Sequence, residues 1–373
     1  MIYLDNAATT RPMKSAIQDA EGALNELYFN PSASYAGGIQ THGEIGRARE
    51  EILSLVGGTE NFGLIFTSCG TEADNQAMFG SVKRGNLVVS GGEHAAVYEC
   101  AKELKNRGLE VRIAPLNRDG SVDRDALLRL VDEKTALVSV IHVNNETGAV
   151  NPVGRIAEQV KEKNARALFM SDGVQAFGKI PFRLTKHIDF YTLSAHKIGA
   201  PKGIGALIVK KGVKAEAYLY GGGQESGKRS GTENVFGILA FASAAKRKFS
   251  TLKEDGERIL SYRERLFEKL DKDLFVRLSP ENGTPYILTV SAKGLRGETL
   301  VRMLSDRGVY AGKGSACSSK KPFSRVIEAC GVERELLDGV LRFSFSPENS
   351  EAEIDEAAEI VNRTAKELYG RIR

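Results

Sequence analysis

The chain has 373 residues, of which 42% are hydrophobic and 27% charged, a composition typical of soluble globular proteins. The formal net charge is only +4, and Lys and Arg are dispersed, so no electrostatic feature favours binding to nucleic acid or to a membrane. The N-terminus lacks the basic and apolar regions of a signal peptide, and no apolar run approaches membrane-spanning length. We therefore expect a cytoplasmic protein.

Short apolar runs between residues 63 and 209 predict strands, and segments such as residues 123–131 and 153–163 predict helices between many of them. Continuous apolar runs such as residues 136–141 are typical of strands covered on both faces. The expected strands are residues 63–67, 87–90, 110–114, 136–142, 167–171, 189–193 and 204–209. This alternation predicts an α/β fold with a mainly parallel central sheet flanked by helices.

The pattern changes near residue 250. A polar helix is expected at residues 252–270, followed by strands at 286–290 and 341–345 with helices between and after them. Ser350 and Glu353 form a capping-box pattern at the start of the last helix. We expect a large α/β domain at residues 12–250 and a smaller α+β domain made of residues 1–11 and 251–373.

Ser194, His196 and Lys197 follow directly on the expected strand at residues 189–193. Lysine is rarely buried without a partner, so a lysine at the end of a buried strand is either at the surface or has a chemical role. A desolvated lysine loses its proton readily and forms a Schiff base with an aldehyde.

Polar residues also follow other expected strands. Asp172, with Gln175 three residues later, suits either pairing with a ring nitrogen or capping of a helix N-terminus. His94 suits stacking on a planar ligand, proton transfer or a structural role. Asn145 lies in a polar turn and either completes that turn or offers an amide to a ligand.

Two segments suit anion binding. Gly70 and Thr71 begin a helix directly after a strand, where free backbone N–H groups and a hydroxyl favour a phosphate, although an ordinary N-cap has the same pattern. The glycine-rich stretch from Gly221 to Thr232 is a second candidate for contact with a phosphate.

Cys317 differs from the other cysteines. Gly and Ser surround it, and three nearby lysines favour the nucleophilic thiolate. Cys100 and Cys330 instead have the apolar neighbours of buried structural thiols. Arg342 stands on an expected apolar strand, where a guanidinium forms either a bidentate carboxylate clamp or a buried ion pair.

Together these positions supply an aldehyde-capturing lysine, a ring-nitrogen aspartate, a ring-stacking histidine, a phosphate cradle and a carboxylate-binding arginine. A pyridoxal phosphate enzyme needs these parts, because the cofactor is the electron sink and the protein supplies placement and charge. The additional thiol of Cys317 points to sulfur chemistry.

Over effectively its whole length the chain resembles the cysteine desulfurases, members of the class V aminotransferase group of pyridoxal phosphate enzymes. The most specific motifs are S-A-H-K ending at Lys197, G-G-G-Q-E at residues 221–225, R-S-G-T ending at Thr232 and G-S-A-C ending at Cys317. The last motif resembles the subgroup with a long, mobile cysteine loop. Departures from the family motifs occur at Tyr35, where a histidine is usual, and at Cys69 and Ala200.

The resemblance implies fold type I of the pyridoxal phosphate transferases, with the cofactor ring held by four residues. Lys197 should bind the cofactor covalently, and Asp172 should pair with its pyridine nitrogen. His94 should stack on the ring and assist proton transfer, and Gln175 should contact the ring oxygen.

The same resemblance assigns the cofactor phosphate to Gly70, Thr71, Ser194 and His196. Thr232 should join them from the neighbouring subunit of a homodimer.

The resemblance also implies the substrate and the reaction. Arg342 and Asn145 should hold the carboxylate of L-cysteine, and Cys317 should take its sulfur as a persulfide while L-alanine is formed. An iron–sulfur scaffold protein or a tRNA-thiolation enzyme should accept the sulfur. The alternatives are a selenocysteine lyase, a related class V aminotransferase, or a catalytically idle sulfur-trafficking scaffold.

Overall fold

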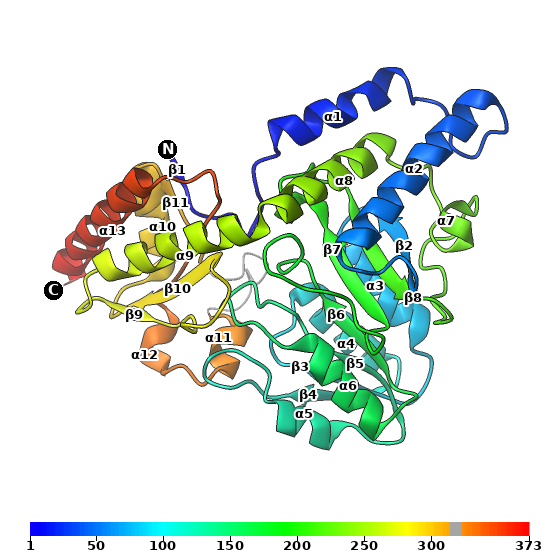
Figure 1. Ribbon diagram of the computed structural model, residues 1–373. Coiled ribbons are helices and arrows are strands. Elements are labelled where there is room, and N and C mark those ends of the chain that lie inside the picture. The colour runs from blue at the N-terminus through cyan, green and yellow to red at the C-terminus, as the bar shows by residue number, and fades with distance from the viewer. Residues whose placement is uncertain (314–322, 373) are drawn as a thin grey trace.

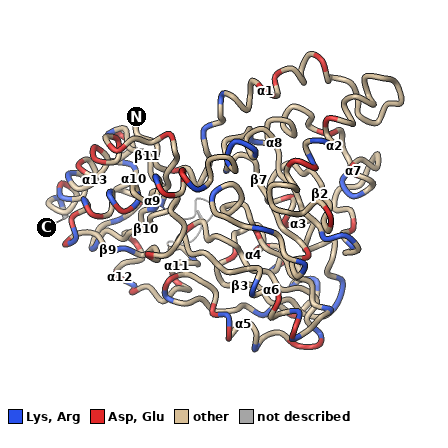
Figure 2. Tube along the Cα trace, in the orientation of Figure 1, with Lys and Arg blue, Asp and Glu red and all other residues tan. Residues whose placement is uncertain are grey.

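The computed structural model describes residues 1–313 and 323–372. Acidic and basic residues are interspersed along the tube drawn in Figure 2, as the dispersed charge of the sequence predicts. Within the described ranges, no helix is long and apolar enough to cross a membrane.

The larger sheet has seven strands in the order β2-β8-β7-β6-β5-β3-β4. They are β2 (Phe62–Thr67), β3 (Asn86–Ser90), β4 (Glu110–Ala114), β5 (Thr135–Ser139), β6 (Leu168–Asp172), β7 (Phe190–Ser194) and β8 (Gly205–Lys210). The prediction of a mainly parallel sheet is confirmed, with one exception: β8 runs antiparallel to both β2 and β7. The connection at residues 195–204 is shorter than the roughly dozen residues that a parallel crossover needs.

Helices cover both faces of this sheet (Figure 1). Successive residues of β3 belong to different hydrophobic cores. Val88 belongs to the core that includes residues of α2, α5, α6 and α8, whereas Val89 belongs to the core that includes residues of α3 and α4. These helices are α2 (Ala36–Leu55), α3 (Gly70–Ser81), α4 (Ala95–Asn106), α5 (Arg124–Leu130), α6 (Val153–Lys163) and α8 (Val235–Ser250); α1 (Lys14–Asn25) packs on α8, and α7 is the short turn Gln224–Gly227. Burial on both faces explains the continuous apolar runs of these strands.

Residues beyond 250 form a second layered region around a three-stranded antiparallel sheet of order β12-β10-β9. Its elements are α9 (Leu252–Lys269), β9 (Phe275–Arg277), β10 (Ile287–Ala292), α10 (Gly297–Asp306), β11 (Val309–Tyr310), α11 (Arg325–Ala329), α12 (Arg334–Leu337), β12 (Val340–Ser344) and α13 (Glu351–Ile372). The N-terminal β1 (Ile2–Tyr3) pairs with β11, and Leu4 packs in the same core as Phe343. The chain therefore begins in this region and then crosses to the large sheet.

The start of α13 has the predicted capping box. The backbone N–H of Ser350 donates to Glu353 Oε2 at 3.0 Å, and the backbone N–H of Glu353 donates to Ser350 Oγ at 3.2 Å. Two N–H groups at the helix start are thus satisfied reciprocally.

Strand β5 is shorter than expected, because it ends at Ser139 rather than at residue 142. The backbone N–H of Ile141 donates to Glu93 Oε1, and its carbonyl accepts from the side chain of Asn151. The backbone groups of Ile141 therefore bond to side chains rather than to a neighbouring strand.

Candidate active site

A cavity of about 120 Å³ lies at the carboxyl ends of β6 and β7, which end at Asp172 and Ser194. Parallel α/β sheets bind ligands at this edge. The cavity is lined by nine of the residues predicted from the sequence, namely Gly70, Thr71, His94, Asn145, Asp172, Gln175, Ser194, His196 and Lys197. Their individual roles stay predictions, but the fold brings them together.

The remaining predicted residues lie elsewhere. Arg342 is buried on β12 and contacts the cavity residue Asn145. Thr232 is exposed and does not line the cavity of its own chain. Cys317 lies outside the described residues.

The N-terminus of α3 forms one end of the cavity. A Cβ at Gly70 would lie 2.8 Å from Val174 Cγ2, so only glycine leaves this contact unstrained. Thr71 follows, and the free N–H groups of the first helical turn favour an anion. His196 Nδ1 lies 3.0 Å from Thr9 Oγ1, and burial lowers the pKa of His196 to about 4, so its imidazole is neutral near pH 7. A neutral imidazole and a hydroxyl offer hydrogen bonds to a phosphate.

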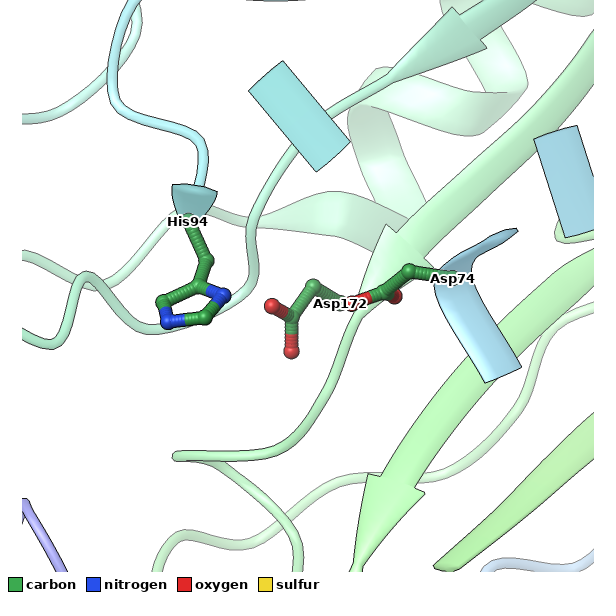
Figure 3. Close-up of side chains that lie close together, drawn as sticks. All are labelled: Asp74, His94 and Asp172. Atoms are coloured by element: carbon green, nitrogen blue, oxygen red, sulfur yellow. The ribbon is translucent and has the colours of Figure 1, made fainter. Parts of the chain in front are cut away.

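Asp172, His94 and Asp74 gather at the other end, where one nitrogen or oxygen atom of each lies within 4.8 Å of the others (Figure 3). Asp172 Oδ1 accepts from the backbone N–H of Val174 at 2.9 Å. Burial raises the pKa of Asp172, while His94 and Lys197 oppose that shift. A cationic ring N–H beside Asp172 would hold this buried carboxylate ionised.

Asp74 was not predicted from the sequence. It is 1% exposed, and its Oδ1 accepts from Thr192 Oγ1 at 2.7 Å. Burial, and secondly the charge of Asp172, raise the pKa of Asp74 well above its usual value. Two carboxyl groups this close do not both ionise readily, so we infer that Asp74 keeps a proton while Asp172 carries the charge.

The side chain of His94 has a defined tautomer. Its Nδ1 accepts from the backbone N–H of Ala96 at 3.2 Å, which leaves the proton of the neutral ring on Nε2. Burial lowers the pKa of His94 more than the charge of Asp172 raises it. His94 is therefore a neutral, planar ring that caps α4 and faces the cavity.

Lys197 lies in a short 3₁₀ turn, Ala195–Lys197, directly after β7. Its Nζ donates to the backbone carbonyls of Ala7 and Ala8, both at 2.7 Å. Gln175 Nε2 also donates to the carbonyl of Ala7, at 2.8 Å. The segment that crosses between the two layered regions thus positions the amine and the amide in the cavity.

Arg325 was also not predicted from the sequence. Its guanidinium donates to the backbone carbonyls of Gly91 and Glu93 and lies 3.8 Å from the ring centroid of Tyr98. It therefore connects the start of α11 to the turn that carries His94.

This arrangement fits pyridoxal phosphate. The N-terminus of α3 provides an anion site, Asp172 provides a buried carboxylate for a ring nitrogen, and the amine of Lys197 lines the same cavity. The glycine at position 70 leaves room where any side chain would collide with Val174.

Comparisons with known proteins agree with the fold and with the family that the motifs indicate. Residues 2–357 match the family model described as aminotransferase class V. A cysteine desulfurase of Nostoc sp. is 37% identical over 99% of this chain and 94% of its own length, and the cysteine desulfurase IscS of Methanosarcina thermophila is 36% identical over 98% and 92%. The chain belongs to the class V aminotransferase family, as the sequence motifs predicted.

Solved structures show the same fold. A NifS-like protein superposes with a TM-score of 0.91 at 34% identity, covering 98% of this chain and all of that one. The structure described as SspA in complex with cysteine has a TM-score of 0.81 at 27% identity, covering 94% of this chain and all of its own. Fold type I is therefore confirmed.

Proposed function

We propose that this chain is a pyridoxal-phosphate-dependent cysteine desulfurase that converts L-cysteine into L-alanine and leaves the sulfur on Cys317 as a persulfide. The observation that carries this proposal is the convergence of Lys197, Asp172 and His94 in one cavity of a chain whose relatives are cysteine desulfurases. L-cysteine is the substrate and pyridoxal 5′-phosphate the cofactor.

Lys197 binds the cofactor, and Asp172 pairs with its ring nitrogen. Gln175 contacts the ring oxygen, while Gly70 and Thr71 at the start of α3 hold the phosphate with Ser194 and His196. When bound, the cofactor acts as a sink for the electrons released at the substrate carbon atoms.

Lys197 and His94 carry out the proton transfers of the reaction. The amine of Lys197 is kept at the edge of the cavity by the carbonyls of Ala7 and Ala8. The neutral ring of His94 carries its proton on Nε2. These two groups move protons between the substrate nitrogen and carbon atoms.

Arg342 binds the substrate carboxylate, together with Asn145. The guanidinium is 3% exposed and carries a buried Nε with no hydrogen-bond partner in the described part of the chain. A carboxylate would satisfy this donor, and the charge-assisted bond would orient the substrate.

The Cys317 thiolate attacks the sulfur of the bound substrate. The new S–S bond forms as the Cβ–S bond breaks, the electrons of that bond remain with the substrate carbon, and a proton completes L-alanine. The persulfide then passes to an iron–sulfur scaffold protein or a tRNA-thiolation enzyme in the cytoplasm.

The active form is a homodimer, in which the exposed Thr232 of one protomer contacts the cofactor phosphate in the other. Residues 12–250 form the cofactor-binding domain, and residues 1–11 and 251–373 form the smaller domain that carries the cysteine loop. Support for this division comes from the joint core of Leu4 and Phe343.

The purified holoenzyme tests this proposal when it is incubated with L-cysteine in the presence of dithiothreitol. We expect alanine and sulfide in equal amounts, and no turnover by Lys197→Ala. Release of pyruvate in place of alanine would contradict the proposal.

A further inference from the structure

A second cavity, of about 340 Å³, also touches Lys197. Its walls come from the crossing segment, residues 6–13, which leads from the second layered region to the large sheet. The junction of α8 with α9, the start of β10 and the residues after β12 complete them. Five basic and two acidic side chains line it, so its formal charge is positive. The proposed desulfurase reaction assigns no role to this cavity.

Lys179 is the most buried basic side chain specific to this second cavity, at 5% exposure. Its Nζ donates to Gln175 Oε1 at 2.7 Å, and in the described part of the chain the charges that act on it are those of other cations rather than of a carboxylate. Burial, followed by the charges of Lys197, Lys248 and Arg342, lowers the pKa of Lys179 well below its usual value. With no counter-anion beside it among the described residues, this amine is driven towards its neutral form, and a bound anion would favour the ammonium.

Two further polar groups in this cavity are incompletely satisfied. Lys248 is 9% exposed, and Asp255 lies 3.8 Å from it but already accepts from Thr251 and Arg258 at 2.9 and 2.7 Å. The hydroxyl of Tyr286 is buried and has no hydrogen-bond partner among residues 1–313 and 323–372. A buried hydroxyl without a partner is unfavourable, and a ligand oxygen that accepts from it would remove that penalty.

The remaining surface of the cavity is largely apolar. Met13, Ile287 and Phe345 line it beside these polar groups. An inorganic anion would use only the basic part, whereas an organic carboxylate would bury an apolar group as well.

We propose that this second cavity binds a small organic carboxylate, with its anionic end at Lys179, Lys248 and Tyr286 and its apolar end against Ile287 and Phe345. The site is connected to the proposed catalytic lysine, because Gln175 accepts from Lys179 and donates to the carbonyl of Ala7, which also accepts from Lys197. The proposal does not depend on the desulfurase reaction.

Calorimetric titration of the holoenzyme with benzoate tests the site, with benzamide as the uncharged control. We expect one benzoate bound per chain and no binding of benzamide. Lys179→Met and Tyr286→Phe should each weaken benzoate binding, Lys179→Met by at least about tenfold. Lys246→Met is the matched control, because Lys246 is a neighbouring lysine on α8 that is 71% exposed and does not line the cavity; it should bind benzoate as the wild type does.

The position of the ligand is tested by the anomalous signal of 4-iodobenzoate in crystals of the holoenzyme. We expect iodine beside Ile287 and Phe345. Iodine found only beside Arg342, no binding of benzoate, or wild-type affinity in Tyr286→Phe would overturn the proposal. Tyr286→Phe removes a single oxygen atom, so it remains informative if Lys179→Met fails to fold.

Discussion

Arg342 and Asp5 join the second layered region to the N-terminal segment through a direct ion pair, with Arg342 Nη2 2.9 Å from Asp5 Oδ1. The other terminal nitrogen, Nη1, donates to the carbonyl of Asn145 at 2.7 Å. The guanidinium is thereby held in one orientation, next to a residue that lines the proposed active site. This orientation suits recognition of a carboxylate.

Arg342→Lys should therefore weaken binding of the substrate. Lysine keeps the charge but loses the planar fork, so we expect the KM for L-cysteine to rise by about tenfold or more, consistent with a lost hydrogen bond to a charged group of about 1.5–3 kcal/mol. Steady-state kinetics check this prediction, with Arg302→Lys on the exposed face of α10 as the control. An unchanged KM in Arg342→Lys would remove this residue from substrate binding.

Lys197→Ala should abolish covalent attachment of the cofactor. The wild-type protein, reduced with borohydride and then denatured, should retain the cofactor on a peptide that contains Lys197, because reduction fixes the Schiff base. In the variant the cofactor should separate from the protein. Lys202→Ala, an exposed lysine nearby, should behave as wild type. Mass spectrometry that finds the reduced cofactor on another lysine would exclude Lys197.

Asp74→Asn and Asp172→Asn should differ strongly, although the two carboxyl groups are neighbours. Burial raises the pKa of Asp74 well above its usual value, so an uncharged amide should replace it with little loss of activity. Asp172→Asn should lower kcat by about 100-fold, because it removes the charge that we propose pairs with the ring nitrogen of the cofactor. Equal losses of kcat in the two variants would contradict the assignment of the proton to Asp74 and of the charge to Asp172.

Much of this architecture follows from the sequence. The apolar runs indicated the strands, because a strand that is buried on both faces consists mainly of apolar residues. The polar residues at strand ends indicated the candidate site, because those ends meet at one edge of the sheet. The antiparallel orientation of β8 was not predicted. The expected strands at residues 189–193 and 204–209 leave only ten residues between them, so the length of this connection, rather than hydrophobic periodicity, was the signal that could have indicated it.

Other features could not be predicted because they arise only in three dimensions. Asp74 is buried in α3, but in the sequence it stands in the polar stretch of residues 71–76, which gives no signal of a neighbouring carboxylate. Lys179 and Tyr286 are far apart in the sequence and come together only in the folded chain, where both line the second cavity. Glu225 has a φ of 49° and pairs with Arg49, a contact that the glycine-rich motif does not indicate.

His142 should make the stability of the protein depend on pH. It is 4% exposed, its Nδ1 lies 2.8 Å from Tyr191 Oη, and burial lowers its pKa from the usual 6.5 to about 3. Below about pH 6.5, His142 therefore binds a proton in the unfolded chain but stays neutral in the folded chain. This contribution is fully present above pH 6.5 and is lost as the pH falls towards 3, by about 1.4 kcal/mol per pH unit.

Urea unfolding at pH 7 and pH 5 measures this effect. The free energy of unfolding should decrease more between these pH values in the wild type than in His142→Gln, by up to about 2 kcal/mol. The same decrease in both proteins would mean that His142 is protonated in the folded state.

The central claim is that sulfur leaves L-cysteine as a persulfide on Cys317 while alanine forms. The most direct measurement is one turnover of the holoenzyme with ³⁵S-labelled L-cysteine and no reductant, followed by quantification of alanine and mapping of the labelled peptide, with Cys330→Ala as the matched control. We predict about one alanine per active site and reducible label on Cys317, in the wild type and in Cys330→Ala alike, with the label absent from Cys317→Ala. Alanine formed by Cys317→Ala at the wild-type rate, or label on another cysteine, would contradict the account.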